Sequence, residues 1–431
     1  MDLRKIKPIS TGRLCPCAAR YNAVYGEPEI SMIKHFAIKS FKSILDASLD
    51  LGRVNVFIGA NGSGKSNLLE AIGVLGAAAN GVVDDESLLR RGVRPGLPAL
   101  YKSSFTGTDT RPSIRIEASS DSGARYAVEL NNPIQDPQPA WEFKNEILSE
   151  DKNRIAGRSP ASSKSLRLDP QRGYIALKAV ELEPSSPASE LVSIMQRYCI
   201  YTPTTNCLRG LDPDRQQREP IGLSGGRLPE AVSELLRNQK SSQFIKSVCS
   251  QALSLIDWAN TYGSMSDDGR IPLSPSAAKS QRVLYFKDKF MAQGRNLITG
   301  YDASEGALYV LFAAVVAAHP LAPSLLAVDN IDHGLNPRLA RALVKSLCNW
   351  CMNEESITKQ LVLTTHNPLA LDGLPLDNPD IRLFAVERSR RGHTVISRVN
   401  LPSLEDLQRN GELWTVSRLW VMGHLGGVPN V

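Results

Sequence analysis

The fold class of this chain follows from one stretch, VNVFIGANGSGKS, which runs from Val54 to Ser66. Its apolar start, Val54–Ile58, predicts a short buried strand, and the residues from Asn67 to Ala79 predict a helix. Between them lies the spacing GxxxxGK[ST], which is typical of a phosphate-binding loop (P-loop) in this strand–loop–helix context. Glycines let successive backbone N–H groups turn inward onto phosphate oxygens, and the helix adds the positive end of its dipole.

The P-loop predicts a site for ATP and Mg²⁺. We expect Lys65 to reach the outer phosphates and the Ser66 hydroxyl to coordinate the metal ion. The nucleotide-binding residues predicted in this segment are Gly59, Ala60, Asn61, Gly62, Ser63, Gly64, Lys65, Ser66 and Asn67.

Two further apolar runs end in side chains suited to phosphate chemistry. The run Leu325–Val328 ends at Asp329, which is predicted to be the second ligand of the metal ion. The run Leu361–Thr365 ends at His366, which is predicted to contact the γ-phosphate. Because ligands bind at the carboxyl ends of the strands in an α/β sheet, we expect both side chains to face the P-loop. Asn330 follows Asp329 and is predicted to lie beside the attacking water.

The composition is that of a folded chain. Apolar residues make up 42% and charged residues 22%, which excludes a mainly disordered protein. The longest apolar run, Ala307 to Ala318, is shorter than the roughly 20 residues that a membrane helix needs. Scattered cysteines without a secretory signal favour a reducing compartment, so we expect a cytoplasmic protein with no membrane partner. The net charge of +6 permits a polyanionic partner but does not require one.

The strand and helix patterns predict an α/β fold whose P-loop head is split along the chain. Residues 32–80 and 301–400 are expected to build the head, and residues 81–300 an inserted region that is first β-rich and then helical. Residues 1–31 show no periodic pattern and are expected to form a loose extension. Residues 401–431 should form a C-terminal helix, docked against the core, and a tail.

Two polar features stand outside these elements. The segment from Asp151 to Ser165 is rich in lysine, arginine and serine and predicts a linker or mobile loop. Arg90, Arg91 and Arg94 form a basic cluster able to meet nucleic acid, whereas Arg388 is expected at a solvated hairpin tip. No interleaved aromatic residues support base stacking at either place.

Phe41–Ser43 and Thr364–Pro368 carry a family resemblance. Together with the P-loop and Asp329, they resemble the ATPase heads of the ABC superfamily, on the side of the SMC, RecF and overcoming-lysogenisation-defect proteins. The chain is most similar to the AAA-type ATPases of prokaryotic anti-phage defence. The resemblance implies a P-loop ABC-type head with a mixed sheet, an inserted α+β or helical region, and a homodimer or higher homo-oligomer closed around ATP.

In related heads, a Ser-x-Gly element of one subunit binds the γ-phosphate held by the other. Ser304, Glu305 and Gly306 match this element and precede the helix that leads into strand 325–328. Leu223–Gly226 spells LSGG, the usual letters, but at least two helices separate it from that strand. Ser304 can also cap its helix and offer a hydroxyl to phosphate. We therefore predict that the serine at 304 forms the signature and that LSGG is a chance loop.

The resemblance implies a catalytic glutamate directly after Asp329, but this chain has Asn330. An amide cannot act as a general base, whose help is worth about 10²–10⁴-fold, although it can orient water. Asp332 is a weaker candidate for the missing acid. We therefore expect a slow ATPase that controls a separate effector, a nuclease or a toxin.

Two alternatives stay open at this point. A RecF-like clamp would use ATP to close on duplex DNA, and its DNA binding would weaken steeply with salt. A non-hydrolysing scaffold would bind ATP without turnover. A small nuclease gene beside this one would favour control of an effector.

Overall fold

The computed structural model describes residues 31–107, 110–165, 167–266, 281–353, 359–400 and 414–427. The loose extension expected for residues 1–31 lies outside this part of the chain, apart from its last residue. The same holds for the first half of the expected C-terminal segment.

The P-loop belongs to a mixed sheet with the strand order β15-β14-β3-β13-β12-β8. All strands run parallel to β3 except β15, which pairs antiparallel with β14. The strands are β3 (Val54–Ile58), β8 (Ile200–Tyr201), β12 (Leu325–Val328), β13 (Gln360–Thr365), β14 (Ile381–Arg388) and β15 (Thr394–Arg398). This head sheet confirms the α/β class and the mixed sheet. Its strand β8 comes from the region expected to be inserted, because Ile200 and Tyr201 complete the edge beside β12.

A second sheet is antiparallel, with the order β2-β1-β4-β5-β6-β7. Its strands are β1 (Ile33–Phe41), β2 (Ile44–Asp50), β4 (Ser113–Ser120), β5 (Ala124–Asn131), β6 (Glu142–Glu150) and β7 (Asn153–Arg158). Four of these strands come from the region expected to be inserted. They continue a sheet that β1 and β2 begin, because β4 pairs along the free edge of β1. The region expected to be inserted therefore shares a sheet with β1 and β2 of the head.

The linker or mobile loop expected from Asp151 to Ser165 is wrong. Asp151 and Lys152 adopt φ of 43° and 74° and form a tight turn into β7, which is followed by helix α4 (Pro160–Ser165). The first three residues of β7 are exposed, because the strand lies at the edge of its sheet, where hydrophobic alternation is not required. Its last residue, Arg158, is buried and donates to the carbonyls of Asp169 and Arg172.

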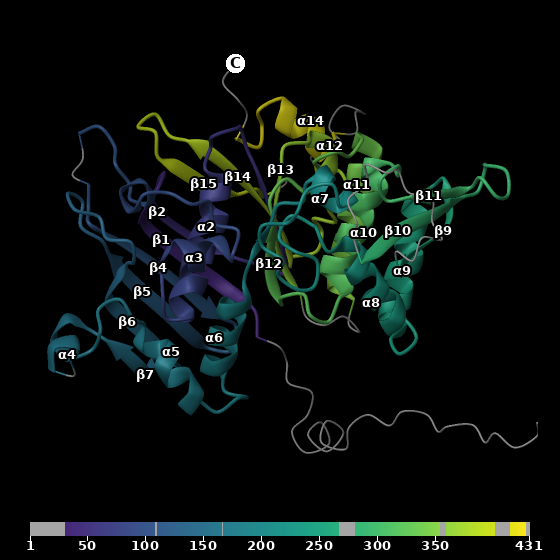
Figure 1. Cartoon of the computed structure of the whole chain (residues 1–431). Helices are drawn as coiled ribbons and strands as arrows, with labels where there is room; N and C mark the ends of the chain where they lie inside the picture. Colours follow the sequence, from purple (N-terminus) through teal and green to yellow (C-terminus); the bar gives the residue numbers. More distant parts are fainter. Residues whose placement is uncertain are drawn as a thin grey trace, which may run out of the picture.

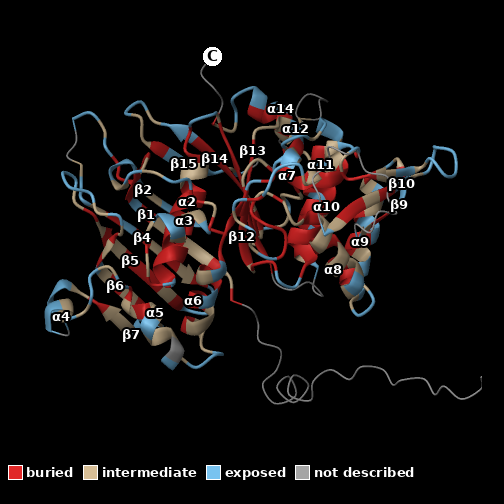
Figure 2. Cartoon of the chain, in the orientation of Figure 1, coloured by how far each residue is buried: buried red, intermediate tan, exposed pale blue. Residues whose placement is uncertain are grey.

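Two hydrophobic cores lie on the two faces of the head sheet. Val54, Val56 and Ile58 face a core made largely by α8–α11, and Phe57 faces a core shared with α2, α6 and the antiparallel sheet. Figure 1 shows the antiparallel sheet on one side, α8–α11 on the other and the head sheet between them. In Figure 2 the central strands and much of α10 are coloured as buried.

The helices differ in burial and length. Helix α10 is buried on every side, as expected for a helix between a sheet and other helices. No helix in the described ranges is both long and apolar enough to cross a bilayer. The helices are α2 (Lys65–Ala79), α3 (Asp85–Leu89), α5 (Tyr174–Lys178), α6 (Pro187–Arg197), α7 (Thr205–Arg209), α8 (Leu228–Asn238), α9 (Gln243–Leu255), α10 (Glu305–Ala318), α11 (Pro337–Met352), α12 (Pro368–Leu371) and α14 (Val416–Val421), with single 3₁₀ turns at Pro98–Tyr101 and Ala179–Glu181.

A third, small sheet packs beside α8 and α9. It has the order β11-β10-β9, with β9 (Ala259–Ser266), β10 (Arg282–Asp288) and β11 (Leu297–Thr299). The strand β11 leads directly to Ser304 at the start of α10. This sheet therefore stands next to the predicted signature element.

The segment 414–427 returns to the P-loop after docking on α12. The Ser417 backbone N–H and hydroxyl donate to the Asp372 carboxylate, at 2.9 and 2.7 Å, and Trp420 is buried. A Cβ placed on Gly427 would lie 3.2 Å from the Cα of Gly59. The last described residue thus lies close to the first glycine of the P-loop.

Candidate functional site

The P-loop connects the buried strand β3 to α2 through a backbone that requires glycine. Gly62 and Gly64 adopt φ of 76° and 113°, in the left-handed region. A Cβ on Gly64 would lie 2.2 Å from the Thr394 hydroxyl. The Ser63 hydroxyl is buried and finds no hydrogen-bond partner among the described residues. Such a loop can accept phosphate oxygens.

The Lys65 ammonium is held inside the loop. Its Nζ donates to the carbonyl oxygens of Gly59 and Ala60, at 2.7 and 3.0 Å, and lies 3.5 Å from Nδ1 of His366. Burial lowers the pKa of Lys65 to about 8, and the nearby carboxylate of Asp329 opposes this only in part. A phosphate oxygen would supply the negative charge that the two carbonyls lack.

Asp329 accepts two hydroxyl hydrogen bonds at the end of β12. Ser66 Oγ donates to its Oδ2 at 3.0 Å, and Thr364 Oγ1 donates to its Oδ1 at 2.6 Å. These three residues come from α2, β12 and β13, which meet at the carboxyl edge of the head sheet. The structure therefore brings together the two residues predicted to hold the metal ion, and their oxygens are the ligand type that Mg²⁺ prefers.

His366 lies at the same edge, after β13. Its backbone N–H is 3.4 Å from both carboxylate oxygens of Asp332. Burial, and then the charge of Lys65, lower the pKa of His366, so its ring is neutral at pH 7. A neutral ring can donate one hydrogen bond to a phosphate while accepting another.

Asn330 has a constrained backbone. Its φ is +56°, which asparagine tolerates better than most residues, and its N–H donates to Thr364 Oγ1 at 2.8 Å. Its side chain lines the cavity above the P-loop. Position 330, where related ATPase heads have a glutamate, thus lies inside the site but has an amide side chain in this chain.

The cavity above the P-loop has a volume of about 420 Å³. Besides Lys65, Asn330 and His366, it is lined by Arg94 and Arg388, which the sequence did not place there. Arg388 is exposed and ends β14 at the hairpin that leads into β15, as expected. Its Nε also donates to the carbonyl of Gly62 at 2.9 Å, a contact that the sequence did not predict.

Arg94 reaches the cavity because α2 carries a buried acid. Glu70 is 2% exposed and accepts from Arg94 Nε at 2.5 Å and from the Lys42 ammonium. Arg94 also donates to the side chain of Asn67 at 3.3 Å. In the sequence, Glu70 stands one helical turn after Ser66. This acid was the signal from which an arginine partner near the P-loop could have been predicted.

Three hydroxyl and amide side chains tie the P-loop to the two sheets. Asn67 Nδ2 donates to Ser43 Oγ at 2.6 Å, and Ser43 Oγ lies 2.7 Å from Thr394 Oγ1. Thr394 Oγ1 donates to the carbonyl of Ser63 at 2.7 Å. Asn67, predicted to bind nucleotide, thus lies at the cavity and also anchors the loop to the Phe41–Ser43 motif.

The predicted signature residues do not line the nucleotide cavity of their own chain. Ser304 precedes α10 without a side-chain cap, is exposed, and accepts a hydrogen bond from Trp258 Nε1 at 3.2 Å. Glu305 accepts from the Thr205 hydroxyl, and a Cβ on Gly306 would lie 2.7 Å from Leu339. Because α10 leads into β12, its start lies on the carboxyl side of the head sheet.

The LSGG stretch forms a tied internal loop. The Asp214 carboxylate accepts from the N–H groups of Ser224 and Gly226, at 2.8 and 3.2 Å, and Leu223 is buried. A Cβ on Gly225 would lie 2.4 Å from Leu208. Its glycines therefore have a packing reason that does not involve phosphate.

A protein-family model described as "AAA domain, putative AbiEii toxin, Type IV TA system" matches residues 54–192 and 204–372. These two segments make up most of the chain and include the P-loop, Asp329 and His366.

The chain is also similar to two curated proteins named DNA replication and repair protein RecF, from Paenarthrobacter aurescens and Renibacterium salmoninarum. Each is 31% identical over 105 residues, which cover 24% of this chain and 26% of the relative. The alignment thus spans about a quarter of the length of these relatives.

Solved structures similar to this chain include an SMC head domain from Thermotoga maritima, at 14% identity and a TM-score of 0.44, covering 86% of this chain and 99% of that one. Another is an SMC head bound to the C-terminal winged-helix domain of ScpA, at 13% identity and a TM-score of 0.48, covering 87% and 99%.

Proposed function

This chain belongs to the AbiEii-type AAA domain family, among the SMC- and RecF-like ATPases, and from that premise we propose that it is a slow, ATP-dependent switch. It binds ATP with Mg²⁺, forms a dimer or a higher oligomer around the nucleotide, and hydrolyses it slowly. The nucleotide state then controls a separate effector, a nuclease or a toxin, in anti-phage defence.

One observation carries this proposal: the hydrogen bond from Ser66 Oγ to Asp329 Oδ2, 3.0 Å long, within reach of Lys65 and His366. Ser66 and Asp329 would hold Mg²⁺, which when bound neutralises phosphate charge and orients the γ-phosphate. Lys65 exchanges its carbonyl partners for phosphate oxygens. The orphaned Ser63 hydroxyl and the open side of Gly62 leave room for them.

The water-activating position explains why turnover is slow. The amide of Asn330 can orient a water molecule by hydrogen bonds but cannot take its proton. Asp332, the nearest alternative acid, lies near the backbone N–H of His366. His366 contributes a neutral ring at the phosphate side of the site. The ATP-bound form would therefore persist long enough to serve as a signal.

Dimerisation follows from the placement of Ser304. Its hydroxyl is exposed, it is oriented by Trp258, and it lies on the carboxyl side of the head sheet but outside its own nucleotide cavity. A second copy of the chain would bring this serine onto the γ-phosphate held by the first copy. Each head would then contribute a P-loop to one nucleotide and a signature to the other.

A matched pair of variants tests the dimer. Ser304→Arg should abolish ATP-driven dimerisation, measured by light scattering, and leave nucleotide affinity unchanged. Ser224→Arg should dimerise like the wild type, because Ser224 sits in the tied LSGG loop. Lys65→Ala, which loses the phosphate contact, should bind no ATP at the P-loop and stay monomeric. A monomeric Ser224 variant beside a dimeric Ser304 variant would refute this placement of the signature.

Defence is supported by the family description, which names an AbiEii toxin of a toxin–antitoxin system. The second candidate, a clamp on duplex DNA, is favoured by the 31% identity to RecF over 105 residues. Binding to bare duplex that falls steeply with salt, in the presence of ATP, would select the clamp. No duplex binding by the wild type in the presence of ATP, together with a loss of effector control in Lys65→Ala, would select the switch.

A further inference from the structure

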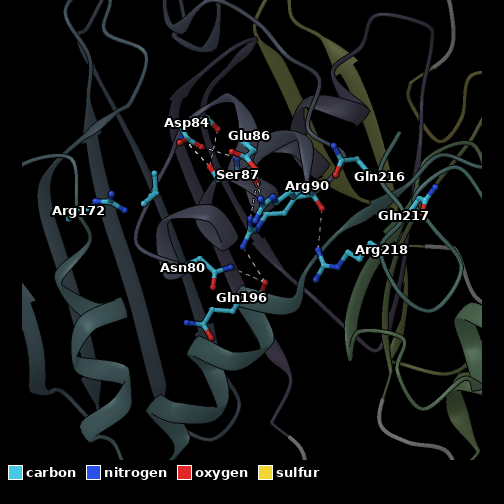
Figure 3. Close-up of a pocket in the computed structure, with 12 residues that line it drawn as sticks. Asn80, Asp84, Glu86, Ser87, Arg90, Arg172, Gln196, Gln216, Gln217 and Arg218 are labelled. Atoms are coloured by element: carbon cyan, nitrogen blue, oxygen red, sulfur yellow. Dashed lines mark hydrogen bonds and ion pairs between the residues drawn. The ribbon is translucent and has the colours of Figure 1, made fainter. Parts of the chain in front are cut away.

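A second cavity, of about 760 Å³, lies away from the P-loop and is larger than the nucleotide cavity. It is lined by the end of α2, by α3 and the turn after it, by the end of α6, and by the loop 216–218. Figure 3 shows Arg172 and Asn80 on one side of it and Arg218 and Gln217 on the other. Its size falls within the range of small-molecule sites, about 300–1,000 Å³.

The charge of this cavity is positive in effect. Four arginines and two carboxylates line it, and one of these carboxylates is paired with one of the arginines. Glu86 pairs with Arg90, and Asp84 accepts from the N–H of Ser87 as the cap of α3. The remaining cations are therefore not neutralised by the cavity's own acids.

Two of these arginines are held by backbone carbonyls. Arg91 is 4% exposed and donates to the carbonyls of Ser87 and Gln196, at 2.8 and 3.3 Å, while its Nε has no partner among the described residues. Arg218 donates to the carbonyls of Tyr198 and Arg197, at 3.2 and 2.5 Å. Within the described ranges, neither guanidinium pairs with a carboxylate.

The two guanidinium groups also act on each other. Burial, and then the charge of Arg218, lower the pKa of Arg91 to about 10. Like charges side by side at a partly buried wall are unfavourable unless an anion lies between them. A phosphate group fits this need, because guanidinium forks match phosphate oxygens in two-point hydrogen bonds.

Amide side chains complete the lining. Asn80, Gln196, Gln216 and Gln217 offer donors and acceptors suited to a sugar or a base edge. Among the described residues no aromatic ring lines the cavity, which argues against stacking of single-stranded nucleic acid. We propose that this cavity is a second ligand site, which binds a nucleotide-sized phosphate ester through Arg91, Arg172 and Arg218.

A short segment links this site to the nucleotide cavity. Arg91 packs along α2, where a Cβ on Gly76 would lie 3.2 Å from its Nε, and Val93 packs against Gly73 in the same helix. Arg94, the next residue, lines the nucleotide cavity. A ligand held by Arg91 therefore acts on a segment whose far end lines the nucleotide cavity.

Isothermal titration of the full chain with inorganic pyrophosphate and with AMP tests the site. The wild type should show two binding sites for pyrophosphate, and Lys65→Ala should retain one. In the Lys65→Ala background, Arg218→Gln and the exposed Arg172→Glu should each weaken the retained site by about 10- to 100-fold, the loss expected for a charge-assisted hydrogen bond. Arg215→Gln is the matched control, because Arg215 is exposed and does not line the cavity.

Three results would overturn the proposal. They are no saturable pyrophosphate binding in Lys65→Ala, equal binding in the Arg172→Glu and Arg215→Gln proteins, and binding of a short oligonucleotide with no binding of AMP. The last would assign the cavity to a nucleic-acid backbone. A failure of the P-loop assignment looks different, because the wild type and Lys65→Ala would then bind pyrophosphate alike.

Discussion

Replacing Gly64 by alanine tests the packing behind the P-loop. The backbone at this position has φ of +113°, which costs a residue with a side chain about 1–3 kcal/mol. The added Cβ would also lie 2.2 Å from Thr394 Oγ1 and 2.9 Å from Ser43 Oγ. Relieving that overlap costs about 1–3 kcal/mol more. We therefore expect the variant to lose about 2–6 kcal/mol of unfolding free energy, a large part of the usual total of about 5–15 kcal/mol.

Gly62→Ala is the matched control. Gly62 has φ of +76°, but its added Cβ would meet nothing within 4 Å, so only the backbone cost of about 1–2 kcal/mol applies. Urea denaturation without nucleotide measures both variants. Adding Thr394→Ala to Gly64→Ala removes the closest overlapping atom, so the double variant should lose less than the sum of the two single losses. Equal costs at Gly62 and Gly64, or strict additivity in the double variant, would refute this account.

Three further outcomes follow from the site. Burial lowers the pKa of Lys65 from 10.5 to about 8, so between these pH values the unfolded chain binds more protons than the folded chain. Lys65 therefore makes the unfolding free energy of the nucleotide-free protein rise with pH in this range. Urea denaturation of Lys65→Met at several pH values should lack that contribution. Asn330→Glu should raise steady-state phosphate release by restoring a general base, and an unchanged rate would mean that the water site is not formed. Trp258→Phe should weaken the ATP-driven dimer about fivefold, as expected for one lost hydrogen bond to Ser304, while analytical ultracentrifugation of the nucleotide-free protein stays unchanged.

The elements closest to the expected bounds have strong local signals. The bounds of α11 are visible in the sequence, because Asn336 caps the helix by accepting from the N–H of Leu339 and Pro337 starts it. The end of α10 is visible because the apolar run stops at His319-Pro320. Caps and breakers lie within a few residues of the helix they bound, so they are visible in a sequence.

The features that were missed depend on contacts between distant segments. Arg388 and Thr394 lie beside the P-loop because β14 pairs with β3, whose residue Ile58 faces Ala385 across the ladder. No pattern near Arg388 records that pairing. In the same way, β7 was missed because its strand character comes from pairing with β6, not from hydrophobic alternation. The roles assigned to Ser304, Asn330 and His366 stay predictions.

The approach of Gly427 to Gly59 has a practical consequence for experiments on this protein. The segment before Gly427 is held on α12 by Ser417, while His424 is exposed. A small fluorophore attached to a His424→Cys variant would therefore stand three residues from the glycine that meets the P-loop. Its emission would be an optical reporter of nucleotide arrival.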